Sequence, residues 1–103
     1  MSLDQHTGEE ITLVEAQGYV AEFAKQFPDE VKSFFVGSIL IESILAQEDC
    51  IGLRAYNGYD DAEGRMNIVF VGVDTDENDM KNGIIVDRCA VCPPVCPTIS
   101  IMD

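Results

Sequence analysis

The residues of this chain whose spacing best fits a chemical site are its four cysteines. Cys89, Cys92 and Cys96 follow one another as C-x2-C-x3-C, with Pro97 directly after the last of them. This order matches the closing half of an iron–sulfur cluster motif, but Val86 stands where a further upstream ligand is needed. One C-x2-C loop is also half of a zinc site, and the matching second pair is absent.

Cys50 completes a set of four ligands only if the C-terminal segment folds back onto the first strand. Three interpretations are therefore open: idle thiols in a rigid tail, which we favour, a disulfide or redox role, and a metal site. In the last case the predicted metal ligands are Cys50, Cys89, Cys92 and Cys96. We expect no cofactor, and zinc or an iron–sulfur cluster are the alternatives.

The second candidate site is the stretch G-L-R-A-Y-N-G-Y-D at residues 52–60. Arg54 and Tyr56 lie on the same face of a predicted strand, because side chains two residues apart share a face. An arginine beside tyrosines either forms an internal ion pair with a local acid, which we favour, or contacts a carboxylate or ring of a ligand. The predicted binding residues are Arg54, Tyr56, Asn57, Tyr59 and Asp60.

Other catalytic or ion-binding patterns have little support. His6 is the only histidine, so a Ser-His or Cys-His pair would depend on a residue near the chain end. The acidic segment from Asp74 to Asp79 begins like a calcium loop, but Asp79 occupies the position of the required glycine. We therefore expect a solvated turn there, and a protein that is not an enzyme.

Charge excludes one class of function. The chain has 103 residues, of which 19 are acidic and 6 basic, and the net charge is −13. A nucleic-acid binder needs a basic face that this composition does not supply, and the charge also disfavours an anionic membrane surface. The N-terminal sequence lacks the pattern of a signal peptide, which predicts a cytoplasmic protein.

The first half of the chain reads as helical. Thr7 and Glu10 have the spacing of a capping box, and apolar residues then recur every three or four positions until Phe27, before Pro28. A short helical turn is expected at residues 29–35. A second, more buried helix follows after Gly37, with Ser38 as its cap.

Beyond residue 50 the apolar period changes to two, which is typical of strands. We expect a strand at residues 51–56, a hairpin loop at 57–64, a central strand at 68–73, a third strand at 83–87 and a short edge strand at 98–102. The predicted fold class is α+β, with two N-terminal helices packed on a three- to four-stranded, mainly antiparallel sheet. Residues 1–103 form a single domain, of which residues 1–6 are expected to fray and 1–3 to be a vector remnant.

Three short motifs together resemble a family of small uncharacterised bacterial proteins. They are G-L-R-x-Y at residues 52–56, V-G-V-D at 71–74 and C-P-P-x-C at 92–96. The resemblance covers residues 38–96 and implies no activity, catalytic residue or cofactor. It does imply that Arg54, Tyr56 and the C-terminal tail belong together.

The function expected from the sequence is a non-enzymatic binding or interaction module for a protein or a small ligand. Its surface would be the sheet face around Arg54 and Tyr56 together with the Cys/Pro-rich tail. The alternatives are a metal-binding or thiol-redox protein, and an acidic inhibitor or immunity-type protein for a basic partner. We expect the tail to cover the second face of the sheet near Cys50 and Arg54, with a homodimer as the alternative cover.

Overall fold

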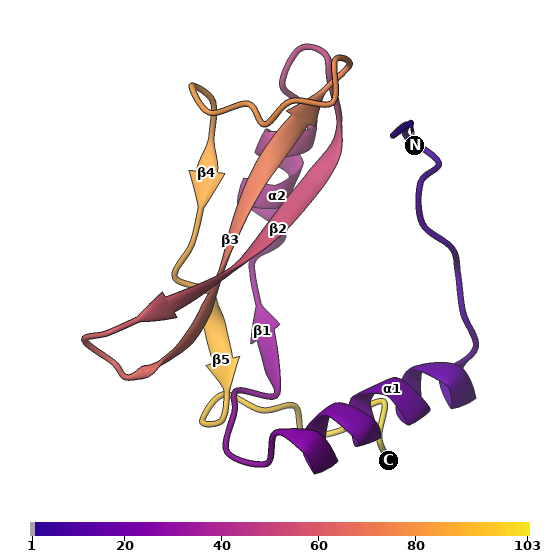
Figure 1. Ribbon diagram of the computed structural model, residues 1–103, viewed down its shortest axis with the longest axis vertical. Coiled ribbons are helices and arrows are strands. Elements are labelled where there is room, and N and C mark those ends of the chain that lie inside the picture. The colour runs from indigo at the N-terminus through magenta and orange to yellow at the C-terminus, as the bar shows by residue number, and fades with distance from the viewer. Residues whose placement is uncertain (1) are drawn as a thin grey trace.

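The computed structural model describes residues 2–103, so the part of the vector-remnant prediction that concerns Met1 lies outside it. Figure 1 shows the elements in chain order: α1 (Leu13–Gln26), β1 (Ser33–Phe35), α2 (Ser38–Leu45), β2 (Cys50–Asp60), β3 (Arg65–Asp74), β4 (Ile85–Val86) and β5 (Ala90–Cys92). They form an α+β fold with two antiparallel sheets, as the sequence predicted.

The main sheet has the strand order β2-β3-β4. β2 and β3 form a long hairpin in which Asp60 pairs with Arg65 and Cys50 with Asp74. The predicted loop at 57–64 was too long, because residues 57–60 find partners across the hairpin and extend the strand. Only residues 61–64 turn, and Gly64 takes the positive φ of 66° that a turn at this point requires.

A second sheet pairs β1 with β5, so that Phe34 lies opposite Val91. The predicted helical turn at residues 29–35 was therefore wrong. The segment Ser33–Phe35 fits either a helical turn or a strand. It forms a strand here because Ala90–Cys92 supplies its hydrogen-bond partners. The predicted edge strand at 98–102 was also wrong, because this segment ends in a turn where the Asp103 amide donates to the Ser100 carbonyl.

Helix α2 packs against the main sheet. Its Ile44 is completely buried, which confirms that α2 is more buried than α1. Gln47, just after the helix, donates from Nε2 to the Ile44 carbonyl (3.0 Å) and accepts from the Ile84 amide (2.9 Å). This side chain ties the end of α2 to the residue before β4. A Cβ on Gly72 of β3 would lie 2.9 Å from Gln47 Nε2, so the absence of a side chain at Gly72 lets α2 approach the sheet.

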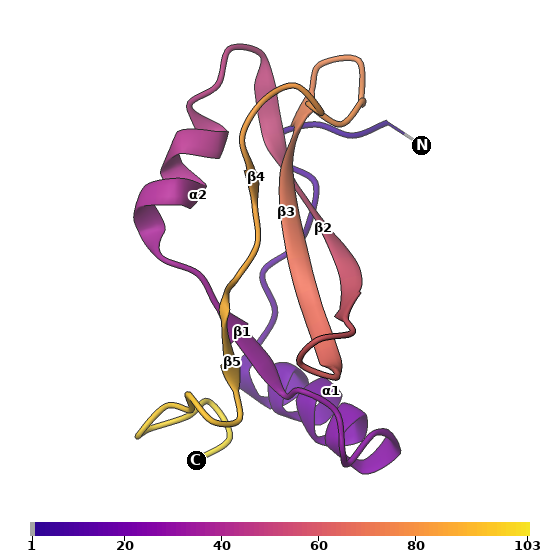
Figure 2. The ribbon, with the colours of Figure 1, turned by 90° about the vertical axis from the view of Figure 1, so that its left-hand side faces the viewer.

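Helix α1 begins after Thr12, not after Thr7. The Glu15 amide donates to the Thr12 hydroxyl while the Thr12 amide donates to the Glu15 carboxylate, which is a complete capping box. The helix ends before Pro28, as predicted. None of its residues is buried, and Figures 1 and 2 show it standing apart from the main sheet. The sequence predicted that both helices pack on the main sheet, and only α2 does so.

The core of the molecule is small. Among residues 2–103 the buried apolar residues are Val31, Ile44, Val71, Val73, Val86 and Val91. Figure 2 shows α2 on one side of the main sheet and the N-terminal segment on the other, where the Leu3 amide donates to Glu77 (2.9 Å). Neither helix in the described part of the chain is long and apolar enough to cross a membrane.

Gly72→Ala is expected to lower the free energy of unfolding by about 1–3 kcal/mol, the range found for overpacked cores. The new methyl group would meet Gln47, Cys50 and Met80 within 3.1 Å. Gly52→Ala is the matched control, since nothing lies within 4 Å of its Cβ position. Urea unfolding of both variants measures the difference, and equal stabilities would contradict this account of α2 packing.

Candidate functional site

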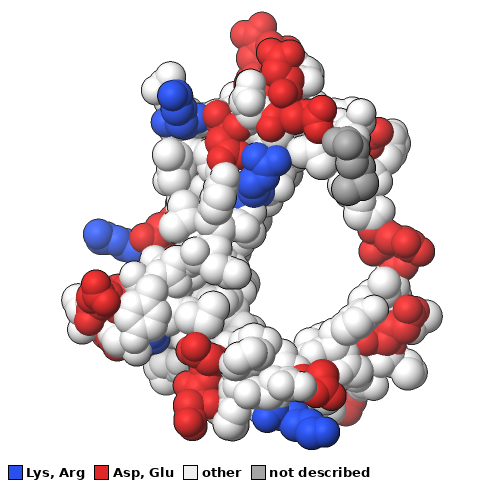
Figure 3. Space-filling model, in the orientation of Figure 1, with Lys and Arg blue, Asp and Glu red and all other residues white. Residues whose placement is uncertain are grey.

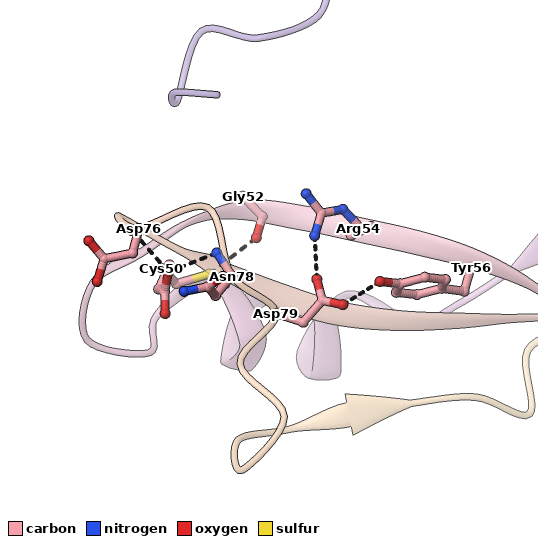
Figure 4. A network of polar contacts seen from close by, with 8 residues as sticks. Cys50, Gly52, Arg54, Tyr56, Asp76, Asn78 and Asp79 are labelled. Carbon is pink, nitrogen blue, oxygen red and sulfur yellow. Dashed lines mark hydrogen bonds and ion pairs between the residues drawn. The ribbon is translucent and has the colours of Figure 1, made fainter. Parts of the chain in front are cut away.

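The strongest polar cluster joins Arg54 and Tyr56 of β2 to Asp79, which lies in the connection between β3 and β4. Arg54 Nη1 is 2.5 Å from Asp79 Oδ1, and the Tyr56 hydroxyl donates to Asp79 Oδ2. Figure 4 shows one carboxylate held between the two side chains. The interpretation that Arg54 forms an internal ion pair with a local acid is therefore confirmed.

The connection is folded so that Asp79 reaches this face. The Met80 amide donates to the Gly72 carbonyl (2.8 Å), and Val73 forms a bridge with Asp79 that continues the edge of the sheet. Asp74 shapes the turn, because its Oδ1 accepts from the amides of Asp76 (2.9 Å) and Asn78 (3.0 Å). The segment that began like a calcium loop thus uses its first carboxylate to bind its own backbone.

The three groups of the cluster shift one another's pKa. The hydrogen bond from Tyr56, and then the contacts with Arg54, hold the pKa of Asp79 below its ordinary value. The hydrogen bond to Asp79 raises the pKa of Tyr56, and Arg54 opposes that effect in part. The hydrogen bond to Asp79 also raises the pKa of Arg54. At neutral pH the cluster is a charged carboxylate between a neutral phenol and a guanidinium.

The other predicted binding residues do not join this cluster. Asn57 and Tyr59 lie on the opposite face of β2, because side chains alternate along a strand. Asp60 lies at the far end of β2, where its Oδ1 accepts from the amides of Ala62 and Glu63. The five predicted residues are therefore split between two faces and the hairpin end.

The hairpin end borders a hollow of about 690 Å³. Tyr59 and Asp60 line it with Arg65, Arg88 and Cys89. Asp61, Glu63 and Asp87 also line it, so both signs of charge are present. Burial, and then the charge of Asp87, raise the pKa of the Cys89 thiol, which keeps it protonated and weakly nucleophilic at neutral pH.

The four cysteines do not assemble into a ligand set. Cys92 and Cys96 form a disulfide, while Cys50 and Cys89 are free and half-buried. The Cys50 thiol donates to the Gly52 carbonyl (3.2 Å). No group of three His, Cys, Asp or Glu side chains within residues 2–103 is arranged to hold a metal ion. The tail does not lie over the second face of the sheet near Cys50 and Arg54 as predicted, because β5 pairs with β1 instead.

Sequence reasoning missed two residues that organise this region, Asp79 and Gln47. Asp79 is one of 19 acidic residues, and nothing in its spacing marks it as the partner of Arg54. Gln47 follows α2, where the sequence indicates only the end of a helix. The one signal in the sequence is that Gln47 lies between an apolar helix and an apolar strand, where a half-buried amide is expected to bind backbone groups.

Comparison with protein-family models, curated proteins and solved structures finds no significant match to this chain. The resemblance of residues 38–96 to a small bacterial family stays a prediction.

Asp79→Asn is expected to lower the melting temperature most between about pH 4 and pH 10, where the native cluster is intact. The depressed pKa of Asp79 gives stability that is present above its ordinary value of 3.8 and lost as pH falls through the lower folded value. The raised pKa of Tyr56 gives stability that is present below 10.0 and lost as pH rises through the higher folded value.

Melting curves of the wild type and Asp79→Asn across this pH range measure the effect, with Asp76→Asn as the control in the same loop. The Asp76 side chain is exposed, while its backbone amide makes the turn contact. A melting difference for Asp79→Asn that stays constant from acid to alkaline pH would show that the cluster does not stabilise the fold in this way.

Proposed function

We propose that this chain is a non-enzymatic protein-interaction module whose docking surface is formed by α1 and residues 95–102. The observation that carries this proposal is the apolar stripe of α1, which has the spacing of a core-facing helix and yet has no buried residue. An amphipathic helix contributes to stability mainly when its apolar face is covered. We therefore propose that a partner protein covers the apolar face of α1.

The α1/C-terminal surface is continuous. Gln17 Nε2 donates to the Ile101 carbonyl (2.8 Å), which holds the C-terminal segment beside the helix. Between them is an apolar hollow of about 420 Å³ lined in part by Tyr19, Phe23 and Met102. The exposed large apolar residues of this surface are Leu13, Val14, Tyr19, Val20 and Phe23 on α1, Phe27 at its C-cap, and Val95, Ile99, Ile101 and Met102 after β5.

The size of the uncovered surface also supports a partner. The chain exposes 7882 Å², whereas a folded monomer of 11.3 kDa exposes about 5,700 Å². The radius of gyration is 15.3 Å, against about 13 Å for a compact domain of this length. The excess of about 2,000 Å² exceeds the roughly 800 Å² that each protein loses in a standard interface.

The earlier candidate surface around Arg54 and Tyr56 is less suited to binding. Asp79 already occupies the side chains that were expected to face a ligand. The end of the predicted Cys/Pro-rich tail, from Val95 to Pro97, belongs instead to the proposed surface beside α1, away from Arg54. We retain the cytoplasm as the compartment.

A basic partner is the competing interpretation of an acidic chain. Figure 3 shows acidic side chains on several parts of one face, with the densest group at the top of the view. An inhibitor that mimics an anionic ligand would use this charge, and salt would release its partner. A partner held by the α1/C-terminal surface would resist salt, because burial of apolar area drives its binding.

Phe23→Asp is expected to abolish capture of partner proteins by the immobilised chain, while Gly18→Asp leaves capture unchanged. Both variants add the same side chain to α1, but Gly18 is exposed with nothing within 4 Å of its Cβ position. Quantitative pull-down from native extract at low and high salt measures the effect. Capture that survives Phe23→Asp, or that salt removes, would refute the proposed surface.

Thiol–disulfide exchange is a second candidate, favoured by the Cys92–Cys96 bond in an exposed turn. Attack by an external thiolate on one sulfur would break the bond and release the other as a thiolate, which takes up a proton. A second external thiol then resolves the mixed disulfide, so that two external thiols are oxidised for each bond reduced. Disulfides that persist in the cytoplasm are usually of this redox-active kind.

Protein purified and denatured without reductant is expected to show two thiols, from Cys50 and Cys89, and four after reduction. The Cys92→Ser, Cys96→Ser double variant should unfold about 2 kcal/mol more easily, from the loop-closure entropy of so short a loop. Thiol titration in glutathione buffers measures the bond, with Cys50→Ser as the control. If the Cys92–Cys96 bond stays oxidised in every glutathione buffer with a reduction potential between about −200 and −300 mV, the redox role is excluded.

A further inference from the structure

We infer that the partner at the α1/C-terminal surface is a second copy of this chain, an inference that rests on the proposed function. The helix supports it first. Leu13 and Val20 of α1 are seven residues apart, Phe27 follows seven residues later at the C-cap, and Ala16 and Phe23 lie three residues after Leu13 and Val20. These are the a and d positions of a coiled-coil seam, which is shaped to receive another helix of the same kind.

The residues that flank this seam carry no charge. In the same heptad register the e and g positions of α1 are Gln17, Tyr19, Ala24 and Gln26. Glu15 and Glu22 are at c, on the outer side of the helix. Two chains of net charge −13 repel one another in general, but no like charges meet at this seam. A basic partner would find no acidic side chain there to bind.

The geometry of α1 permits a symmetric contact. Val20 lies midway between Leu13 and Phe27, so an antiparallel pair crossing at Val20 places Leu13 of each copy near Phe27 of the other. A twofold contact uses the same surface on both copies, and this surface is apolar throughout its seam. The opposed helix directions also bring the dipoles of the two helices into a favourable arrangement.

The area to be covered agrees with a large homodimer. Each chain exposes about 2,000 Å² more than a compact monomer of its mass, while obligate homodimers lose roughly 1,000–2,500 Å² per chain. Figure 3 shows an opening through the molecule beside α1, which no element of residues 2–103 fills. The N-terminal segment borders it and is fastened at its start by the hydrogen bond of Leu3 to Glu77.

Sedimentation equilibrium of the full chain tests the inference, together with Phe23→Asp at a d position and Gly18→Asp at the outward f position. We expect a wild-type mass twice the 11.3 kDa of one chain, and a dissociation constant that falls as salt is added, because salt screens the repulsion. Phe23→Asp should raise that constant at least about tenfold and Gly18→Asp by less than about twofold.

A second measurement does not depend on the folding of Phe23→Asp. Val20→Cys, at the centre of the crossing, is expected to form a disulfide-linked dimer under mild oxidation, while Gly18→Cys stays unlinked. Non-reducing electrophoresis distinguishes the two. Equal cross-linking of both variants, or of neither, would overturn the inference.

The outcomes separate this inference from the proposed function. A wild-type chain that is monomeric at every concentration, or a dimer that Phe23→Asp leaves intact, overturns the second copy as partner. If such a monomer still captures another protein through Phe23, the docking surface stands and its occupant is a different protein. If neither self-association nor Phe23-dependent capture is found, both proposals fail.

Discussion

The pairing of β2 with β3 is the interaction on which the rest of the structure depends. Its hydrogen bonds are local and its register follows from the short turn at residues 61–64. α2 packs on one face at Gly72, where Gln47 fixes its end. Asp79 docks on the other face through Arg54 and Tyr56. Each face of this hairpin is thus held by one polar side chain from another segment. Gln47 acts on the face that α2 covers, and Asp79 acts on the face of Arg54 and Tyr56.

The core that results is small for a chain with this many apolar residues. Hydrophobic residues make up 47% of the sequence, yet Ile44 is the only large side chain fully buried within residues 2–103. Small domains have little stability to spare, since the fraction of surface that they bury falls with size. The apolar area exposed on α1 and the C-terminal segment therefore adds nothing to the stability of the single chain, which is why we propose that a partner covers it.

The sequence predicted the local features and missed the long-range ones. The stop at Pro28, the helix after Gly37 and the period-two strands after residue 50 all follow from neighbouring residues, and all are present. Thr12 could also have been found, since it directly precedes the first residue of the apolar stripe. The pairing of Ser33–Phe35 with Ala90–Cys92 could not have been predicted, because nothing in either segment indicates that it pairs with the other.

The same limit explains why the site was predicted in part. Alternation along β2 placed Arg54 and Tyr56 on one face, and the ion pair followed from the abundance of acids, but the choice of Asp79 depends on how residues 74–80 fold back on β3. The helix shows a related ambiguity. The apolar stripe of α1 predicts that this face is buried, but it does not indicate whether the same chain or another chain covers it. The distribution of charge favours an identical chain, because the acidic residues of α1 lie outside the seam and leave it neutral. A neutral seam on a strongly acidic protein disfavours basic partners at that surface and tolerates an identical one.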